Sequence, residues 1–276
     1  MSAARGEPLL SLVTVCRNAA RTIGDTFASV RAQRSPEVEY VVIDGGSDDG
    51  TVELIRREAG TIDAWVSEPD RGIFDAMNKG ARRSTGRNLW FLNADDRLES
   101  GALSEVLDRL REAAGDGARE GGRVGAGEGG VILAGRTRRV DDDGTTLAID
   151  RHVAPGTRAG EPAHTFAHPS TIMPRALFDR LGGFDPSLRI AGDYDLLWRA
   201  MSLHTPVIEL DRVLTVMRAG GVSSGDAPLA MRVRHELEVL AIQRRHAGVA
   251  AAARGHLVRL GRFLGARAAG PGGSAR

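Results

Sequence analysis

Two adjacent carboxylates follow a run of apolar side chains in the stretch Arg87-Asn88-Leu89-Trp90-Phe91-Leu92-Asn93-Ala94-Asp95-Asp96. Residues 89–92 are short, continuous and aromatic, which predicts a buried strand. Because side chains alternate along a strand, we expect Asn93 and Asp95 on one side and Asp96 on the other. Neighbouring carboxylates repel each other unless a cation, a basic partner or water relieves the repulsion. The alternative is a polar turn in which Asp95 or Asp96 caps the next helix.

The chain around this stretch alternates between two kinds of pattern. Apolar runs predict strands at residues 9–16, 38–43, 64–67 and 89–92. Apolar positions at helical spacing predict helices at residues 19–34, 51–59, 73–84 and 100–114. Such alternation is typical of a mostly parallel sheet with helices on both faces. Ligands bind such sheets at the carboxyl ends of the strands, so we expect Asp44, Asp95 and Asp96 to converge there.

The second half of the chain has a less regular pattern. A glycine-rich interruption at residues 115–130 predicts a flexible loop before a strand at residues 131–135. Asp141 to Gly144 has the composition of a hairpin turn, which we favour over a second acidic metal site. The remaining pattern predicts helices at residues 175–181 and 193–203, then a basic helical segment after Gly220-Gly221. We therefore expect a catalytic domain at residues 1–224, a helical segment at 225–264 and a disordered tail at 265–276.

Composition excludes several classes of protein. The chain has 276 residues, 42% of them hydrophobic and 26% charged, as is typical of a soluble globular protein. The net charge of +1 gives no reason to expect nucleic-acid binding. Cys16 is the single cysteine, so no internal disulfide is expected. With no apolar stretch of about 18 residues and no signal-peptide pattern at the start, we expect a cytoplasmic protein.

A carboxylate also leaves the second strand, in Val41-Val42-Ile43-Asp44-Gly45-Gly46-Ser47-Asp48-Asp49-Gly50-Thr51. Asp49 and Thr51 are explained as residues that cap the following helix. Asp44 is not, because it emerges where a ligand would lie, and it could accept a hydrogen bond from a base N–H. The paired glycines match neither a P-loop nor a GxGxxG fingerprint, which argues against ATP or NAD.

Taken together, these motifs resemble the inverting family-two glycosyltransferases of GT-A fold, in particular bacterial enzymes that build exopolysaccharides and cell-surface glycans. The resemblance extends from about residue 9 to 224, in the order of the family. It rests on the first strand, the Asp44 segment and Leu92–Asp96, and on further matches at residues 70–80, 168–171, 182–185, 191–199 and 220–223. It implies a GT-A, Rossmann-like fold, followed here by the basic helical segment.

The resemblance also implies the roles of individual residues toward a nucleotide-sugar donor. The nucleotide would be held by Val13, Thr14, Val15, Asp44, Asp70, Asn78, Asn93 and Ala94. Arg71, His168 and Asp195 would lie near the donor or acceptor sugar, although for Asp195 we favour a structural role as a partner in the same turn as Asp193.

A divalent cation and a base complete the site that the resemblance implies. Asp95 and Asp96 would bind Mg²⁺ or Mn²⁺, which suits an oxygen-rich site without a cluster of Cys or His. Asn93 replaces the first acid of the Asp-x-Asp form often found at this position. Asp193 matches the catalytic base of the family, although Gly192 stands where a Glu or Ser is common and the alternative for Asp193 is helix capping.

The expected function is transfer of a sugar, from a UDP-sugar, to a saccharide or lipid-linked saccharide. The alternatives are a non-catalytic protein of the same fold that binds glycan or nucleotide sugar, and a sugar nucleotidyltransferase. The latter would need a glycine- and lysine-rich triphosphate loop, which the first strand lacks. Residues 227–276 hold nine arginines and two acidic residues, so this segment either docks on the domain or binds anionic membrane at its cytoplasmic face.

Overall fold

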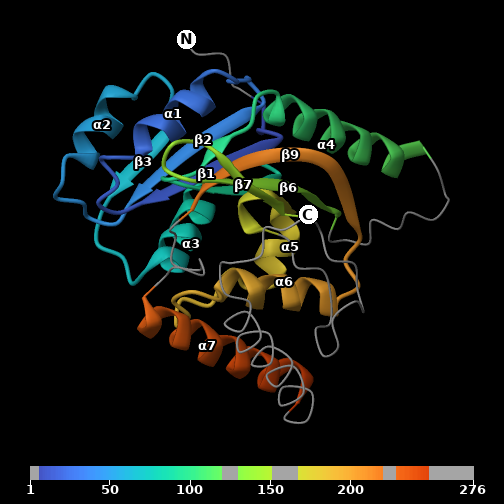
Figure 1. Ribbon diagram of the computed structural model, residues 1–276. Coiled ribbons are helices and arrows are strands. Elements are labelled where there is room, and N and C mark those ends of the chain that lie inside the picture. Colours follow the sequence, from blue (N-terminus) through green and yellow to red (C-terminus); the bar gives the residue numbers. More distant parts are fainter. Residues whose placement is uncertain (1–5, 120–129, 151–166, 220–227, 249–276) are drawn as a thin grey trace, which may run out of the picture.

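The structure is a computed structural model that describes residues 6–119, 130–150, 167–219 and 228–248 (Figure 1). The strands are β1 (Leu10–Cys16), β2 (Val38–Asp44), β3 (Ala64–Ser67), β4 (Asn88–Asn93), β5 (Arg97–Leu98), β6 (Ile132–Val140), β7 (Thr146–Asp150), β8 (Thr171–Pro174) and β9 (Val207–Arg218). The helices are α1 (Ile23–Arg31), α2 (Thr51–Arg57), α3 (Ile73–Arg83), α4 (Ala102–Arg119), α5 (Arg175–Arg180), α6 (Gly192–Ser202) and α7 (Leu229–Ala247), with a 3₁₀ turn η1 (His168–Ser170).

The strands form one sheet in the order β3-β2-β1-β4-β8-β6-β9-β5, with β7 paired to β6. The four strands from β3 to β4 are parallel, as the alternating pattern predicted. The pairs β4–β8, β6–β8 and β5–β9 are antiparallel, whereas β6 and β9 are parallel. The predicted α/β fold with a mostly parallel first half is confirmed, but β5 and β9 were not predicted from the sequence.

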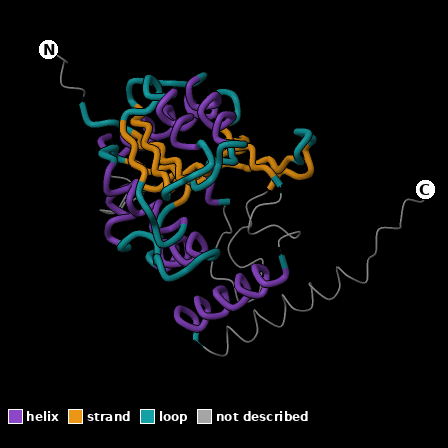
Figure 2. The backbone as a smooth tube through the Cα atoms, turned by 90° about the vertical axis from the view of Figure 1, so that its left-hand side faces the viewer, coloured by secondary structure: helices purple, strands orange, loops and turns teal. Residues whose placement is uncertain are grey.

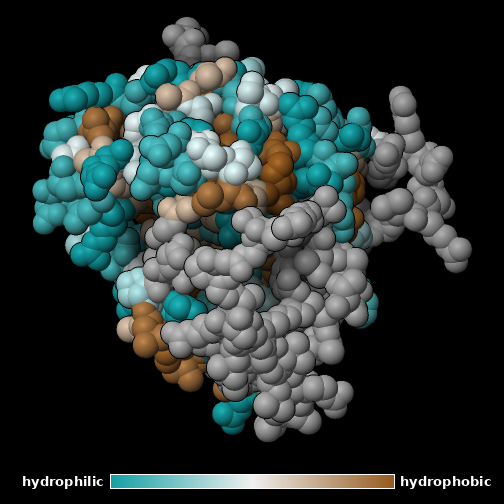
Figure 3. Space-filling model, viewed as in Figure 1, coloured by the Kyte–Doolittle hydropathy of each residue, from teal (hydrophilic) through white to brown (hydrophobic). Residues whose placement is uncertain are grey.

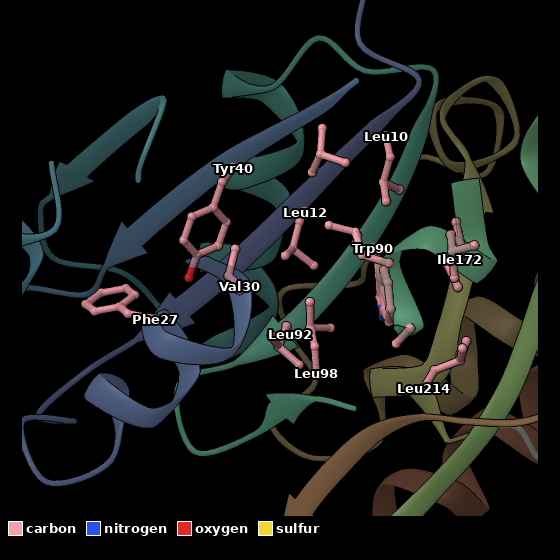
Figure 4. Packing of buried hydrophobic residues seen from close by; sticks show 14 of the residues in the cluster. Leu10, Leu12, Phe27, Val30, Tyr40, Trp90, Leu92, Leu98, Ile172 and Leu214 are labelled. Carbon is pink, nitrogen blue, oxygen red and sulfur yellow. The ribbon is translucent and has the colours of Figure 1, made fainter. Parts of the chain in front are cut away.

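Each face of the sheet carries its own hydrophobic core, because successive side chains of a strand point to opposite faces. Leu10 and Leu12 of β1 pack with α1 and α4, together with the fully buried Trp90 and Tyr40 (Figure 4). Val13, on the other face, packs with α3, α5 and α6. The strands accordingly lie between two groups of helices (Figure 2). Truncating a large side chain in such a core to alanine costs about 3–5 kcal/mol.

Several element boundaries differ from the prediction. The first helix begins at Ile23, because residues 19–22 form a turn. Helix α4 continues through Gly115 to Arg119, so the expected loop does not start at residue 115. A single glycine weakens a helix by about 1 kcal/mol, which Ala113 and Ala114 offset. The expected hairpin turn is present between β6 and β7, where Asp141 Oδ1 accepts hydrogen bonds from the N–H groups of residues 143 and 145.

Helix α7 packs on α6, on the side away from the sheet (Figure 1). Val239 and Ile242 of α7 are buried in the core that includes α6. The expected disordered tail, most of the glycine-rich loop and Gly220-Gly221 lie outside the described residues. Among the helices that the structure describes, none has the length and apolar character needed to cross a membrane.

Candidate active site

Polar groups form a row along the carboxyl ends of four neighbouring strands. The pairing register sets Ser67 beside Asp44, Asp44 beside Cys16, and Val15 beside Asn93. Neighbouring strands lie about 4.8 Å apart, so Asp44 and Asn93 are separated by roughly 10 Å along this edge. The parallel arrangement of β3, β2, β1 and β4 thus brings the two candidate segments to one end of the sheet.

The carboxylate of Asp44 is fully buried and is surrounded by donors of the chain itself. Its Oδ2 accepts from the N–H groups of Gly46 (3.1 Å) and Ser47 (2.9 Å) and from the Ser67 hydroxyl (2.6 Å). Its Oδ1 accepts from the Ser47 hydroxyl and the Cys16 thiol. Burial acts to raise the pKa of Asp44, but the hydrogen bonds from Ser47 and Ser67 prevail, and the pKa lies below its ordinary value.

Asp44 therefore has a structural role that the sequence did not reveal. A carboxylate offers about four lone-pair sites, and the donors of Gly46, Ser47, Ser67 and Cys16 use them. The carboxylate holds the loop after β2 in shape. A hydrogen bond from a nucleotide base to Asp44 stays a prediction, and it requires one of these donors to be displaced.

The predicted nucleotide residues of β1 and β4 do not present their side chains to the edge of the sheet. Val13 and Val15 are buried in one core and Ala94 in the other. The hydroxyl of Thr14 accepts a hydrogen bond from the Tyr40 hydroxyl (3.0 Å) within the protein. The predicted contact of these four residues with a nucleotide stays a prediction, and it would come from backbone atoms at the strand ends because their side chains are used within the protein.

Asp70 and Arg71 connect the loop after β3 to two other parts of the edge. A Cβ placed on Gly45 would lie 2.2 Å from Asp70 Oδ2, so only glycine permits this close approach. The exposed Arg71 guanidinium pairs with Asp75 (3.2 Å). The Arg71 carbonyl accepts a hydrogen bond from the Arg189 guanidinium, which belongs to the segment that precedes α6. This loop thus joins the end of β2 to the start of α6.

Asn78 has a structural place rather than the predicted contact with the nucleotide. Its Nδ2 donates to the Phe184 carbonyl (2.8 Å), and its Oδ1 accepts from the Phe184 N–H (2.9 Å). Both halves of the amide are used, so the side chain fastens α3 to the loop before α6. The sequence could not reveal this pairing, because 106 positions separate the two residues.

The turn after β4 differs from the predicted alternation of sides. The strand ends at Asn93, and the Asp96 N–H donates to the Asn93 carbonyl (3.1 Å), which closes a turn. Asn93 Nδ2 also donates to Asp96 Oδ2 (3.3 Å), so these two side chains lie together while Asp95 is exposed. The prediction of sides is wrong because the extended backbone stops before Asp95. Neither carboxylate caps α4, which begins only at Ala102.

Asp96 is buried beneath this turn, with 1% of its surface exposed. Burial, together with the charge of Asp95, raises the pKa of Asp96 well above its ordinary value. Among the described residues, the buried Asn93 Oδ1 has no hydrogen-bond partner. An unsatisfied acceptor beside two carboxylates is an arrangement that a positive ligand would stabilise.

These oxygens fit a divalent cation in an open site. Within the described part of the chain, no three or more His, Cys, Asp or Glu side chains are grouped as a metal centre. Mg²⁺ is commonly held by one or two carboxylates and completes its shell with water and substrate phosphates. The exposed carboxylate of Asp95 and the free Oδ1 of Asn93 suit this pattern. Asp96 is too deeply buried to contact substrate, and it would support the cation site from beneath the turn.

His168 begins η1 and is positioned by buried hydrogen bonds. The Trp90 indole N–H donates to the Pro169 carbonyl (2.6 Å), which fastens η1 to β4. The Ser170 hydroxyl lies 2.7 Å from the Thr137 hydroxyl and 2.6 Å from that of Thr215, on β6 and β9. Three strands therefore fix the backbone next to His168.

The imidazole of His168 lies beside the carboxylate of Asp193. Its Nδ1 is 3.6 Å from Asp193 Oδ2, and Nε2 is buried without a hydrogen-bond partner among the described residues. Burial lowers the pKa of His168, although the charges of Asp193 and Asp95 act to raise it. The structure thus brings His168 of η1 and Asp193 of α6 together, and Asp95, in the turn after β4, is near enough for its charge to act on His168.

Asp193 is the second residue of α6, with a third of its side chain exposed. Its Oδ1 accepts from the Tyr194 N–H (2.8 Å), while the helix is preceded by Ala191, whose side chain cannot cap. Asp193 is thus not the N-cap residue, although its Oδ1 satisfies one backbone N–H of the first turn and leaves Oδ2 for another role. A Cβ on Gly192 would lie 2.7 Å from the Phe74 ring, which explains why no side chain precedes Asp193.

Asp195 belongs to the interior rather than to the sugar site. It is 1% exposed, and its Oδ2 accepts from the Arg199 guanidinium (2.8 Å). Its Oδ1 lies 3.0 Å from His246 Nε2 of α7. The geometry agrees with the structural alternative for Asp195 and contradicts a place beside the sugar.

Comparison with known proteins agrees with this geometry. Residues 11–181 match the model of Glycosyl transferase family 2. The chain belongs to this family. The matched segment ends before α6, so the assignment of Asp193 rests on other grounds.

Two curated relatives support membership. An uncharacterized glycosyltransferase of Mycobacterium tuberculosis is 29% identical over 226 residues, which cover 81% of this chain and 80% of the relative. A PGL/p-HBAD biosynthesis glycosyltransferase of Mycobacterium bovis is 28% identical over 198 residues, covering 71% of this chain and 70% of the relative. The chain is therefore a glycosyltransferase of family 2, similar to these two mycobacterial proteins.

Solved structures show the same fold. Residues 1–349 of TarS from S. aureus superpose with a TM-score of 0.60 at 17% identity, over 84% of this chain and 64% of that chain. TarS has also been crystallised with UDP-GlcNAc, and this complex superposes with a TM-score of 0.61 at 18% identity. The present chain thus spans just under two thirds of the TarS segment.

Proposed function

We propose that this glycosyltransferase transfers a sugar from a UDP-sugar to a saccharide or lipid-linked saccharide, and that it inverts the anomeric carbon in a single displacement. One observation carries the proposal. His168 and Asp193 come from distant parts of the sequence and lie 3.6 Å apart, and the charge of Asp95, in the turn at the carboxyl end of β4, acts on His168. The complexes of TarS with UDP-GlcNAc and with UDP support a UDP-linked donor for this related fold.

Asp193 is the proposed base. A sugar hydroxyl is a weak nucleophile, and removal of its proton during attack accelerates such reactions roughly 10²- to 10⁴-fold. The Asp193 carboxylate is partly exposed, and Tyr194 N–H fixes the position of Oδ1. The other oxygen, Oδ2, lies 3.6 Å from His168 Nδ1, its nearest recorded partner among the described residues, and is the atom we assign to the proton. His168, held neutral by burial, would orient the acceptor without competing for that proton.

Asn93 and Asp95 are the residues proposed to hold the cation, with Asp96 beneath them. A bound Mg²⁺ or Mn²⁺ would offset the negative charge that the diphosphate gains as it leaves. The chain itself contributes the exposed carboxylate of Asp95 and the Oδ1 of Asn93, which has no partner among the described residues. The hydrogen bond from the Asp96 N–H to the Asn93 carbonyl closes the turn that presents these two groups.

The first experiment measures thermal stabilisation of the protein by UDP, GDP and TDP, each with and without Mn²⁺. A ligand at a hundredfold excess over its Kd stabilises the folded state by about 2.7 kcal/mol. We expect a shift with UDP that requires Mn²⁺ and is lost in Asp95→Asn. The control is Asp108→Asn, which changes an exposed carboxylate of α4. An equal thermal shift by UDP with and without Mn²⁺ would refute the metal assignment.

A second experiment separates binding from chemistry. Asp193→Asn is expected to bind UDP as the wild type does and to lose most of its transfer rate. Release of UDP from UDP-glucose, UDP-galactose or UDP-GlcNAc, with water or added saccharides as acceptor, measures that rate. Full activity of this variant would remove Asp193 as the base.

We further propose peripheral attachment to anionic membrane through the C-terminal segment. A hydrophobic patch lies over the first half of α7 (Figure 3), where Leu229, Val233 and Leu237 are 67%, 49% and 61% exposed. Their spacing of four residues puts them on one face of the helix. An exposed apolar stripe within a strongly basic segment is typical of helices that bind the membrane surface. Leu257, Leu260 and Leu264, which the sequence places on another apolar face, lie outside the described residues.

Sedimentation with vesicles that contain anionic lipid tests this attachment. Replacing Leu229, Val233 and Leu237 together by serine should release the protein from such vesicles. Leu147→Ser is the matched control, because Leu147 is an exposed apolar residue (59%) on β7, away from this helix. Equal binding by the triple variant and the control would leave α7 as a helix that only docks on α6.

A further inference from the structure

A carboxylate from α7 binds the backbone directly in front of α6. Glu238 Oε1 accepts from the Arg189 N–H (3.0 Å), and Oε2 accepts from the N–H groups of Ile190 (2.9 Å) and Ala191 (3.0 Å). The side chain of Glu238 is 11% exposed. Three successive N–H groups that converge on one carboxylate form a charge-assisted, nearly dry contact, which is among the stronger kinds of hydrogen bonding in proteins.

This contact includes the N-cap residue of α6. The Ala191 N–H is one of the donors that a helix end leaves without an intrahelical partner, and Glu238 binds it; the other two N–H groups belong to the segment before the helix. A negative charge at the amino end of a helix also interacts favourably with the helix dipole. Arg234, one turn earlier on α7, donates to Glu238 Oε1 (3.3 Å) and steadies the carboxylate.

The bound segment lies between the two halves of the proposed site. The Arg189 guanidinium donates to the Arg71 carbonyl, in the loop that carries Asp70. After Ala191 the chain passes Gly192, which is pressed against Phe74, and reaches Asp193. Because only Gly192, held against Phe74 in the first turn of α6, separates Ala191 from Asp193, the position of the segment influences where the Asp193 carboxylate stands relative to His168 (3.6 Å).

We propose that Glu238 is a positioning residue for transfer: it holds residues 189–191 so that the carboxylate of Asp193 faces the acceptor hydroxyl. This inference rests on the proposed role of Asp193 as base. It makes α7 part of the catalytic machinery, beyond the segment that matches the family and in addition to any role at a membrane.

The test uses Glu238→Gln in the full chain, with UDP release from a UDP-sugar as the assay. The isosteric amide places an NH₂ group against backbone N–H donors, so the segment loosens without a change in volume. A displacement of about 1 Å at a reacting group can cost roughly 100-fold in rate. We expect kcat to fall roughly 10- to 100-fold, while the Kd and stoichiometry of UDP binding stay unchanged. Glu236→Gln, on the same helix and paired with His235, is the control and should keep wild-type kinetics.

A double-mutant cycle distinguishes positioning from a general effect on the fold. If Glu238 acts through Asp193, then Glu238→Gln changes the residual UDP release of Asp193→Asn by less than about twofold. The same fold-loss in both backgrounds would overturn the inference, as would wild-type kcat in Glu238→Gln. Absence of UDP binding or turnover in the wild-type protein would instead refute the proposed function. Should Glu238→Gln fail to fold, Glu238→Asp, which retracts the charge by one methylene, replaces it in both arms with the same expectations.

Discussion

Gly192→Ala tests whether the core leaves room for a side chain next to Asp193. The added Cβ would lie 2.7 Å from two carbons of the Phe74 ring, whereas an ordinary contact begins at 3.4 Å. The ring cannot retreat easily, because it stacks on Phe184 with a centroid distance of 5.3 Å. Overpacking of this kind costs about 1–3 kcal/mol. We therefore expect the free energy of unfolding to fall by that amount, and the transfer rate to fall as Asp193 shifts.

Urea unfolding at neutral pH measures the effect, with Gly115→Ala as the matched control. Gly115 is also a helical glycine, but a Cβ there meets nothing within 4 Å. The same change in α4 should therefore stabilise the protein by about 0.5–1 kcal/mol, because alanine is the better helix former. Opposite signs for the two variants support the reasoning. A neutral or stabilising Gly192→Ala would refute it, and relief of the cost by an added Phe74→Leu would identify the clashing ring.

Three further predictions follow from the buried polar contacts. The pKa of Asp44 is lowered in the folded protein, so its hydrogen bonds stabilise the fold above the ordinary carboxyl pKa, and this contribution is lost as the pH falls through the folded-state pKa. In urea unfolding at a series of pH values, Asp44→Asn should therefore lose less stability than the wild type below about pH 5. The same loss of stability in both proteins would contradict this. Asn78→Ala should lower the free energy of unfolding by about 1–3 kcal/mol, because it leaves both backbone groups of Phe184 unpaired. The Kd of UDP should stay unchanged, and a large rise in that Kd would support the predicted contact of Asn78 with the nucleotide. Trp90→Phe removes the hydrogen bond to the Pro169 carbonyl, which should lower the free energy of unfolding by about 1 kcal/mol. Because this bond holds η1, the variant should also displace His168 and lower the transfer rate. A loss of stability without any change in rate would show that the position of η1 does not affect catalysis.

The strands and helices of the first half could be predicted from the sequence because their signals are local. Apolar runs mark β1, β2 and β4, and these strands were found within one or two residues. The strand β9 escaped prediction because Glu209, Asp211 and Arg212 interrupt its apolar pattern. Its burial comes from pairing with β6, which the sequence does not display.

The α/β alternation, the family resemblance and the acidic candidates could be predicted from the sequence, because they depend on residue types at short spacing. Which candidates remain open to a substrate depends on tertiary contacts. These contacts surround Asp44 with donors from the loop after β2 and from the ends of β1 and β3, pair Asn78 with Phe184, and bury Asp195 against α7. They also bring His168 to Asp193 and Glu238 to the start of α6. Such contacts join residues far apart in the chain, and they form only when the helices pack on the sheet, so no local pattern in the sequence records them.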